Sequence, residues 1–378
     1  MPEKVYDIAI VGGGLAGLTL SIQCADAGYT TIVFEKEQYP FHRVCGEYIS
    51  MESWNFLEHC GLPLNTWALP QIHRLQVSDS HGSVFDFPLA MGGFGVSRYK
   101  LDNALYGLAV RKGVTICTGC KINDVHFHDE LFLVRHAKGG CRAKLVAGSF
   151  GKRSNLDVKW NRAFILKHAG RLDNYIGVKY HVQYPQPPDT ISLHNFHNGY
   201  CGISRIEEGK CCLCYLTTAQ NLRNSGNSIQ HMEREVLSRN PELRKIFSTV
   251  KFLYDEPLTI SQISFAPKKQ VEEHVLMLGD AAGMITPLCG NGMSMAMHAG
   301  KLAFEQVKKF LASEISRQEM ENAYEASWKK VFGKRLQTGR AVQSFFGGYL
   351  STSLFLRTMH AVPFLGRTII RQTHGKEF

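Results

Sequence analysis

Three glycines near the start of the sequence have the spacing of a phosphate-binding turn. Gly12, Gly14 and Gly17 form a G-x-G-x-x-G pattern directly after a short apolar run, and a segment rich in alanine and leucine follows. In such a turn the first glycine allows a sharp bend, the second lets a pyrophosphate approach the backbone, and the third lets a helix pack closely on a strand. The start of the helix offers free N–H groups to the phosphates. The pattern therefore predicts a dinucleotide-binding site.

An acidic residue supports this prediction. Glu35 ends a second apolar run, 31–34, where a carboxylate can accept hydrogen bonds from ribose hydroxyls. Strand, glycines, helix, strand and acid occur in the required order within about 30 residues. The alternative is an ordinary strand–helix–strand crossover without a ligand, and the complete set of features favours the ligand-binding interpretation. We expect Leu15, Ala16 and Lys36 to border the same site.

A second glycine-rich loop lies far along the chain. Gly279 and Asp280 follow a short apolar run, and the Asp280 carboxylate can accept a hydrogen bond from a polyol hydroxyl beside a phosphate. We expect a helix over 291–312, with Met293 in its first turn, whose N-terminus suits a negatively charged ligand. The alternative is a simple strand–loop–helix turn capped by the aspartate. The loop residues that would let the backbone approach a flat ligand are Pro287, Gly290, Asn291 and Gly292.

Taken together, these stretches resemble the FAD-dependent monooxygenases with the para-hydroxybenzoate hydroxylase fold. The glycine-rich start with Glu35, GDAA at 279–282 and P-x-x-G-x-G at 287–292 carry the resemblance, which covers most of residues 5–310. RVCGE at 43–47 is most similar to the geranylgeranyl reductase and flavin-dependent halogenase branch. The resemblance implies two domains and an extended FAD, with its adenine end at Glu35 and its isoalloxazine near the 287–292 loop.

The resemblance also implies a set of residues around the cofactor. Arg98 with Asp102 matches the family's arginine-bearing helix, and Arg43 would place a cation close to the pyrophosphate. NADH or NADPH is considered as the reductant. The full set of predicted FAD-binding residues is Gly12, Gly14, Leu15, Ala16, Gly17, Glu35, Lys36, Arg43, Cys45, Gly46, Arg98, Ile122, Gly279, Asp280, Pro287, Gly290, Asn291, Gly292 and Met293.

Two departures from the family pattern bear on the reaction. Hydroxylases of this fold usually carry an Asp-Gly pair in mid-chain, whereas this chain has Phe150 before Gly151, which puts direct hydroxylase-style use of NAD(P)H in doubt. The G-W-x-W-x-I-P motif of tryptophan halogenases is absent. The nearest stretch, 199–206, fits a strand that lines a substrate cavity, and from it we predict Tyr200 and Gly202 as substrate residues.

Cys45 and Glu47 are the candidate catalytic residues. The resemblance places both in a loop that faces the cofactor, where the thiol could face the substrate and the carboxylate could orient it. The alternatives are a small buried cysteine and a glutamate that caps the following helix or holds its loop. We predict no metal site, because the crowded Cys211, Cys212 and Cys214 have no second ligand pair at a suitable spacing.

The bulk composition narrows the class of protein. A net charge of +10 could indicate nucleic acid, a membrane surface or an acidic partner, but no basic run interleaved with aromatic residues resembles a nucleic-acid module. Eleven cysteines without a secretion signal suggest free thiols in the cytoplasm. The C-terminal segment, 344–376, mixes apolar and basic residues. It could contact a membrane, although a helix that covers the substrate domain is the favoured interpretation.

We therefore predict an α/β protein, α+β overall, with a Rossmann-type FAD-binding domain, an inserted β-sheet substrate domain and a helical C-terminus. The segments are 1–72, 98–160 and 266–312 for the FAD-binding domain, 73–97 and 161–265 for the substrate domain, and 313–378 for the C-terminal helices.

The predicted function is an FAD-dependent oxidoreductase acting on a small apolar organic substrate. It would act by monooxygenation or by hydride transfer to a carbon–carbon double bond. A halogenase-like enzyme fed by a separate electron-donor reductase is one alternative, and a non-catalytic flavin-binding scaffold or substrate carrier is another. The substrate could also be presented by an acidic carrier protein.

Overall fold

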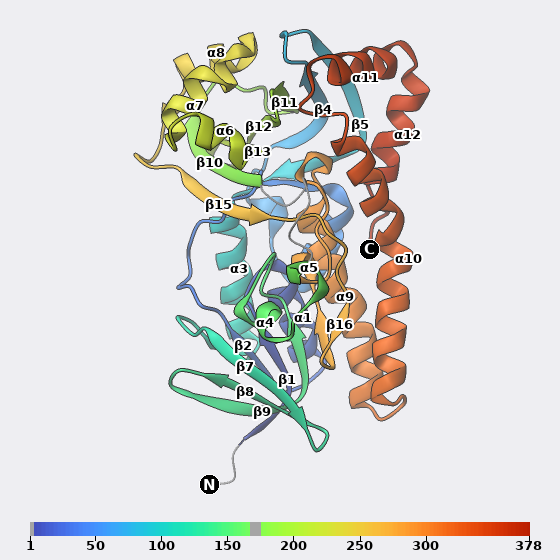
Figure 1. Ribbon diagram of the computed structural model, residues 1–378. Helices are drawn as coiled ribbons and strands as arrows, with labels where there is room; N and C mark the ends of the chain where they lie inside the picture. The colour runs from blue at the N-terminus through green and yellow to red at the C-terminus, as the bar shows by residue number, and fades with distance from the viewer. Residues whose placement is uncertain (1–3, 167–174) are drawn as a thin grey trace.

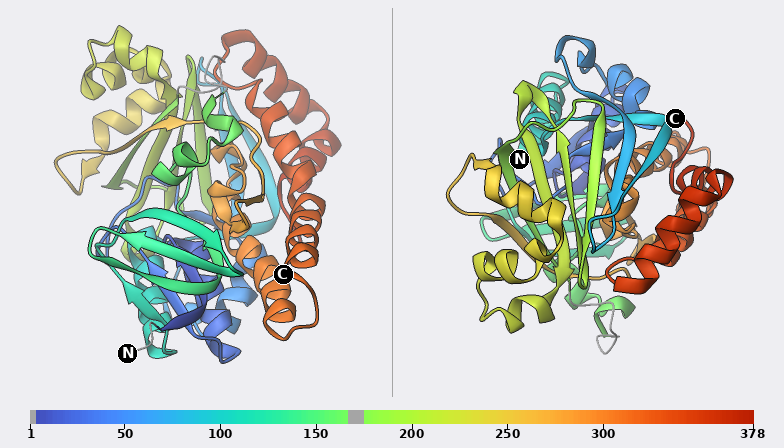
Figure 2. Two further views of the ribbon diagram at one scale, coloured as in Figure 1. Left: turned by 60° about the horizontal axis from the view of Figure 1, so that its bottom comes forward. Right: turned by 90° about the horizontal axis from the view of Figure 1, so that it is seen from above.

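Two large sheets, each with its own helical cover, organise the molecule. The computed structural model describes residues 4–166 and 175–378 (Figure 1). The sheet at the N-terminal end of the chain carries the glycine-rich turn, and the second sheet lies beyond it, as the two further views confirm (Figure 2). This arrangement confirms the predicted α/β class with a helical C-terminus.

The first sheet has the order β16-β17-β9-β1-β2-β6, with the β7–β8 hairpin attached to β9. Strand β1 pairs in parallel with β2 on one side and with β9 on the other. Its residues 8–11 are buried, as expected for a central strand covered on both faces. The strands are β1 (Val5–Val11), β2 (Thr31–Phe34), β6 (Thr115–Cys117), β7 (Ile122–His128), β8 (Leu131–His136), β9 (Gly139–Gly148), β16 (Val271–Glu272) and β17 (Val275–Met277).

The second sheet has the order β14-β10-β13-β12-β11-β4-β5-β3, with β15 paired to β10. It is antiparallel except where β11 runs parallel to β4. The short β3 joins this sheet although it comes directly after the 43–47 loop, because it pairs with β5. The strands are β3 (Tyr48–Ser50), β4 (Gln71–Ser78), β5 (Val84–Gly95), β10 (Tyr175–Gln183), β11 (Thr190–Phe196), β12 (Gly199–Arg205), β13 (Cys211–Thr218), β14 (Lys251–Phe252) and β15 (Leu258–Ile263).

The helices form four groups around the sheets. Helices α1 (Leu15–Asp26), α2 (Trp54–Cys60), α3 (Arg98–Arg111) and α9 (Gly292–Leu311) pack around the first sheet. The short α4 (Asn155–Lys159) and α5 (Ala163–Leu166) follow β9. On the second sheet, α6 (Ala219–Asn224), α7 (Ile229–Glu235) and α8 (Pro241–Thr249) lie on one flank, and α11 (Tyr349–Ala361) and α12 (Pro363–Thr373) lie on the opposite flank (Figure 1). The long α10 (Arg317–Gln343) packs along α9 and joins the core of the first sheet.

Candidate functional site

The glycine turn has the geometry that a pyrophosphate requires. A Cβ on Gly12 would collide with the Ser149 carbonyl oxygen after β9 at 2.3 Å, and one on Gly17 with the Gly12 carbonyl oxygen at 2.2 Å, so Gly17 serves the close packing of α1 on the turn after β1. A Cβ on Gly14 would meet its nearest neighbour, the Arg98 Nη2, only at 3.9 Å. Gly14 is also the N-cap of α1 and supplies no side-chain cap, so the first N–H groups of the helix are open to an anion.

A chain of charged groups surrounds the predicted ribose site. The Glu35 carboxylate accepts hydrogen bonds from the backbone N–H of Gly13, at 2.9 Å, and from the Arg43 Nη2, at 3.0 Å. Arg43 also contacts Asp102 at 3.2 Å, and Arg98 binds both oxygens of that aspartate at 2.7 Å. Two arginines are therefore fixed beside the turn by buried carboxylates, as cofactor binding would need.

The Gly279–Asp280 turn lies at the end of β17. Burial raises the pKa of the Asp280 carboxyl, and Lys268 donates a hydrogen bond to the Asp280 carbonyl oxygen at 2.7 Å. Burial lowers the pKa of both Lys268 and Lys152 to about 8. These two lysines were not among the residues that the sequence predicts, because nothing in their spacing relates them to the aspartate.

The predicted flavin loop leads into α9. Gly290 has φ +67, in the left-handed region, and a Cβ there would come within 2.9 Å of the Tyr48 ring. Asn291 is buried, and its Oδ1 atom has no hydrogen-bond partner. The first turn of α9 has no side-chain cap and begins at Gly292, so its N–H groups are available to a ligand at this end of the molecule.

These features fit an FAD. The open backbone at Gly14 suits the pyrophosphate, and the Glu35 carboxylate can bind the ribose. The flavin can be bound by the uncapped start of α9 and by the Asn291 Oδ1, which has no hydrogen-bond partner. The other predicted cofactor residues fall into two groups. Leu15, Ala16, Met293 and Ile122 are buried, whereas Lys36 and Gly46 are exposed.

A large apolar cavity opens beside the flavin loop. The space between β4, β5 and β11 of the second sheet and the C-terminal helices amounts to about 780 Å³ when the part that is open to solvent is included. The described residues that line it include no Asp, Glu, Lys or Arg. They are Tyr48, Leu75, Val77, Phe87, Leu89, Ile191, Leu193, Pro287, Leu288, Cys289, Gly290, Val342, Phe346, Phe355, Leu356, Met359, Ile369, Ile370, Thr373 and His374.

Tyr48 is a site residue that the sequence analysis missed. It lines the cavity and packs against Gly290, and its hydroxyl is buried without a hydrogen-bond partner. Burial, with the Glu52 carboxylate nearby, raises the pKa of the phenol, so it stays protonated at neutral pH. The sequence feature that could have indicated Tyr48 is its position directly after Cys45-Gly46-Glu47. That pattern gave no reason to choose Tyr48 instead of Glu47 as a site residue.

Glu47 lies in a buried ion cluster rather than in the cavity wall. Its carboxylate accepts hydrogen bonds from the Lys179 ammonium, from His181 Nε2 at 2.6 Å and from the backbone N–H of Arg98 at 2.8 Å. Although burial raises the pKa of this carboxyl, the Lys179 charge and the His181 hydrogen bond outweigh it and lower the pKa. The carboxylate thus joins the 43–47 loop to β10 and to the start of α3.

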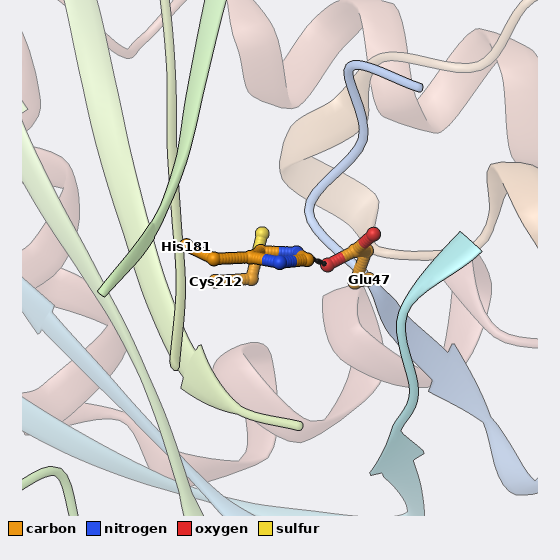
Figure 3. Close-up of side chains that lie close together, drawn as sticks. All are labelled: Glu47, His181 and Cys212. Carbon is orange, nitrogen blue, oxygen red and sulfur yellow. Dashed lines mark hydrogen bonds and ion pairs between the residues drawn. The ribbon is translucent and has the colours of Figure 1, made fainter. Parts of the chain in front are cut away.

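The same cluster contains three groups that could ligate a metal. Ligand atoms of Glu47, His181 and Cys212 all lie within 4.8 Å of one another (Figure 3). The Lys179 ammonium already neutralises Glu47, and the Cys212 thiol donates to the Cys45 carbonyl oxygen at 3.2 Å. A second cation would be repelled by this ammonium, so the arrangement is better described as an ion network.

The remaining predicted residues lie outside the cavity wall. Cys45 is partly buried, and burial raises the pKa of its thiol, so it carries no thiolate at neutral pH. Tyr200 is buried in β12, with its hydroxyl unpartnered and its ring 6.5 Å from that of Phe346. Gly202 pairs with Leu193, a cavity residue, on the neighbouring strand. Neither Tyr200 nor Gly202 lines the cavity, but both lie next to residues that do.

Comparisons with known proteins agree with this geometry. A family model described as FAD binding domain matches residues 7–43, and one described as squalene epoxidase matches residues 202–332. The chain is an FAD-dependent oxidoreductase. Among its relatives, digeranylgeranylglycerophospholipid reductase 2 of Methanopyrus kandleri is 22% identical over 361 residues, covering 90% of this chain and 86% of that protein.

The chain is also similar to flavin-dependent halogenases. The 1H-pyrrole-2-carbonyl-[peptidyl-carrier protein] brominase of Pseudoalteromonas luteoviolacea (strain 2ta16) is 23% identical over 324 residues, 81% of this chain and 78% of the brominase. The structure of the flavin-dependent brominase Bmp2 superposes with a TM-score of 0.80 at 19% identity, covering 98% of this chain and 93% of that one. The resemblance of this flavoprotein to the reductase and halogenase-like branch is therefore confirmed.

A first prediction concerns the Gly279–Asp280 turn of the flavoprotein. Asp280→Ala should weaken FAD binding about tenfold, because one charge-assisted hydrogen bond to the cofactor is lost while the glycine turn remains. Fluorescence titration of the apoprotein with FAD would measure the dissociation constant. Asp255→Ala, an exposed aspartate elsewhere, is the control. An unchanged dissociation constant for Asp280→Ala would argue against cofactor contact.

Proposed function

We propose that this flavoprotein transfers a hydride to a carbon–carbon double bond of a long apolar substrate. The observation that carries the proposal is the cavity beside the flavin loop, whose described lining has no charged residue and is mostly aliphatic or aromatic. Such a wall gains free energy by removing apolar surface from water and offers almost no partners to a polar substrate. A chain-like alkene is the substrate class that it fits.

The protein supplies the surroundings of the reaction. When bound and reduced, FAD supplies a hydride to one alkene carbon, and the other carbon needs a proton. Tyr48 is the proposed proton donor, because its protonated phenol lines the cavity at Gly290 and its hydroxyl has no other partner. His374, at the cavity wall, has its pKa lowered by burial and is neutral at pH 7, so it leaves the cavity without charge.

Electrons must then return to the cofactor. We infer that they come from a nicotinamide, NADH or NADPH, or from a separate reductase. The separate reductase is included because the chain has Phe150 before Gly151, where hydroxylases of this fold carry the aspartate associated with direct nicotinamide use. The reduction consumes two electrons and two protons for each double bond. The odd number of cysteines, eleven, and the lack of a paired C-x-x-C framework support the cytoplasmic location that we propose.

Anaerobic flavin spectroscopy tests the proposal. The FAD-loaded protein is first reduced, with NADH, NADPH or dithionite, and its absorbance is followed without oxygen. Addition of a polyisoprenoid alkene such as geranylgeraniol should restore the oxidised flavin spectrum, and the product should contain a saturated bond. Bleaching by a nicotinamide would also identify the reductant. Reoxidation that requires oxygen, with no saturated product, would contradict alkene reduction.

Oxygen transfer is the second candidate function. The specific observation in its favour is the match of residues 202–332 to a model described as squalene epoxidase. In that case the same cavity would hold the apolar substrate, but the product would gain an oxygen atom. The anaerobic experiment separates the two reactions, because the second candidate predicts reoxidation only when oxygen is admitted, with an oxygenated product.

The proposed role of Tyr48 gives a further prediction. Tyr48→Phe should lower the rate of substrate-driven flavin reoxidation by about 10²-fold or more, because a general acid contributes on that scale. FAD content should be unchanged, since the phenol hydroxyl makes no hydrogen bond to any of the described residues. Stopped-flow absorbance measures the rate.

A second tyrosine serves as the matched variant. Tyr200→Phe also removes an unpartnered buried hydroxyl, but from a residue that does not line the cavity, and should leave the rate within about twofold. An equal loss in both variants would instead support the substrate role that the sequence predicts for Tyr200. An unaffected Tyr48→Phe variant would remove Tyr48 from the reaction.

A further inference from the structure

The C-terminal helices expose apolar side chains to an unusual extent. Within the described residues, only three large hydrophobic side chains are more than half exposed, and all three belong to α11 and α12. They are Leu350, at 83%, Leu354, at 69%, and Phe364, at 75%. Single exposed hydrophobic residues are normal, but three on adjoining helices indicate an interaction surface.

These side chains form one outward stripe on each helix. On α11 the exposed residues Leu350, Leu354 and Arg357 recur at intervals of four and three, which places them on one face. On α12 the stripe consists of the exposed Phe364, Arg367 and Arg371. We call these six residues the outer stripes. The two helices lie on the outside of the molecule, on the flank opposite α6–α8 (Figure 1).

The inner faces of the same two helices form part of the cavity wall. Phe355, Leu356 and Met359 of α11 line the cavity, and so do Ile369 and Ile370 of α12. Each helix is therefore apolar on both sides, with the cavity on one side and solvent on the other. A helix of this kind, exposed to water at its outer face, is unfavourable unless that face has an apolar partner.

The charge of this region is uniform. Residues 326–376 contain nine lysines and arginines and no aspartate or glutamate. One of the nine, Arg335, is buried against Glu52. The arginines of the outer stripes are exposed. Exposed apolar residues flanked by arginines are the pattern of helices that lie in the interface of an anionic membrane.

We infer that the outer stripes bind an anionic lipid surface, from which the apolar substrate passes between the helices into the cavity. This inference rests on the proposed function for its substrate class. Within the described residues no helix is long and apolar enough to cross a membrane, so the contact is with the surface. Leu350, Leu354 and Phe364 enter the acyl boundary, and the three arginines contact lipid phosphates.

A carrier protein is the other partner that a basic apolar surface could suit. A carrier delivers its substrate on a phosphate-linked arm with amide groups, which needs hydrogen-bond partners along its path. The described cavity wall offers few polar groups beyond Tyr48, Cys289, Thr373 and His374. The exposed apolar side chains, on two helices, also suit a continuous apolar phase better than a small acidic protein. These observations favour the lipid surface.

Vesicle flotation of the FAD-loaded full-length protein tests the inference. The probes are vesicles of phosphatidylcholine alone and vesicles of phosphatidylcholine mixed with phosphatidylglycerol. The wild-type protein should float with the mixed vesicles and remain unbound with phosphatidylcholine, and high salt should weaken the binding. Failure to float with either vesicle at low salt would overturn the inference.

Three triple variants locate the surface. Arg357→Glu/Arg367→Glu/Arg371→Glu and Leu350→Ser/Leu354→Ser/Phe364→Ser should each lower the partition coefficient at least about tenfold. The control, Arg239→Glu/Lys245→Glu/Lys251→Glu, makes the same charge change at exposed residues on the opposite flank and should bind within about twofold of wild type. FAD absorbance and the melting temperature confirm that each variant is folded. Equal losses in the control and in the helix variants would overturn the assignment of the surface.

Two further outcomes separate this inference from the proposed function. Flotation requires no turnover, so a protein that reduces detergent-dispersed alkene but does not float would overturn the lipid surface alone. A protein that floats through the outer stripes but reduces no alkene would overturn only the proposed function. Binding of an acidic carrier protein through the same arginines, without flotation, would replace the lipid by that carrier.

Discussion

Replacing Gly14 by glutamate should leave the protein without FAD. The space beside Gly14 is open in the structure, and the uncapped start of α1 points its free N–H groups there, where the pyrophosphate would lie. A glutamate side chain would fill that space and place a negative charge against the phosphates. We expect the dissociation constant for FAD to rise by about 10³-fold or more, since steric exclusion and like-charge repulsion each cost several kcal/mol at short range.

The ratio of flavin to protein absorbance after purification measures this loss. Gly333→Glu is the matched control, because Gly333 lies in α10 and a Cβ there would meet no neighbour within 4 Å, while one on Gly14 would meet only the Arg98 Nη2 at 3.9 Å. It should retain FAD at the wild-type ratio and melt at a similar temperature. A Gly14→Glu protein that keeps a stoichiometric amount of FAD would place the pyrophosphate elsewhere.

The cofactor site could be predicted from sequence because its determinants are local. The glycine turn depends on residues 12–17, which follow one another in the chain, and Glu35 sits at the end of the next strand. Helix α9 begins at Gly292, one residue from its predicted start. Backbone shape and helix dipole are properties of a short segment, so spacing alone conveys them.

The substrate cavity could not be predicted in the same way. Its wall combines strands 71–95 and 190–196 with helices that begin more than a hundred residues later, and no local pattern encodes those contacts. The sequence pointed to Tyr200 on the expected substrate strand, whereas the structure places Tyr48 in the wall. Tyr48 reaches the wall because β3 pairs with β5, and this pairing leaves no signal in a three-residue strand.

The partners of Glu47 could not be predicted from the sequence either, because they are also distant along the chain. Lys179 and His181 lie more than 130 residues away along the chain, and they meet the glutamate only because β10 packs against the 43–47 loop. The sequence analysis left open whether Glu47 orients a substrate or holds its loop. The three donors that saturate its carboxylate support the second role, and they make the residue a test of how the two domains are joined.

Glu47→Ala should destabilise the protein by about 3–5 kcal/mol, because it leaves the fully buried Lys179 ammonium without its counter-charge. In the wild-type protein the pKa of Lys179 is raised: burial lowers it, but the Glu47 charge more than compensates. The stabilisation from Lys179 is therefore present below its unfolded pKa and lost as the pH rises through the folded value. The stabilisation from Glu47, whose pKa is lowered, is present above its unfolded pKa and lost as the pH falls through the folded value. Around neutral pH both contributions are complete.

Removal of Glu47 reverses the direction of the pKa shift of Lys179 on folding. Without the carboxylate, burial lowers the Lys179 pKa below its unfolded value. The unfolded state then binds more protons, so the variant gains stability as the pH rises toward about 10 and the deficit relative to wild type narrows. Urea unfolding at pH 7 and pH 9 measures both effects.

Glu208→Ala is the matched control. Glu208 also pairs with a lysine, Lys210, and also has a positive φ, 60° against 55° for Glu47, but it is exposed. It should cost less than about 1 kcal/mol at either pH. Equal losses in the two variants would mean that backbone strain, not the buried ion cluster, accounts for the effect, and Glu47 would lose its role in joining the 43–47 loop to β10 of the second sheet.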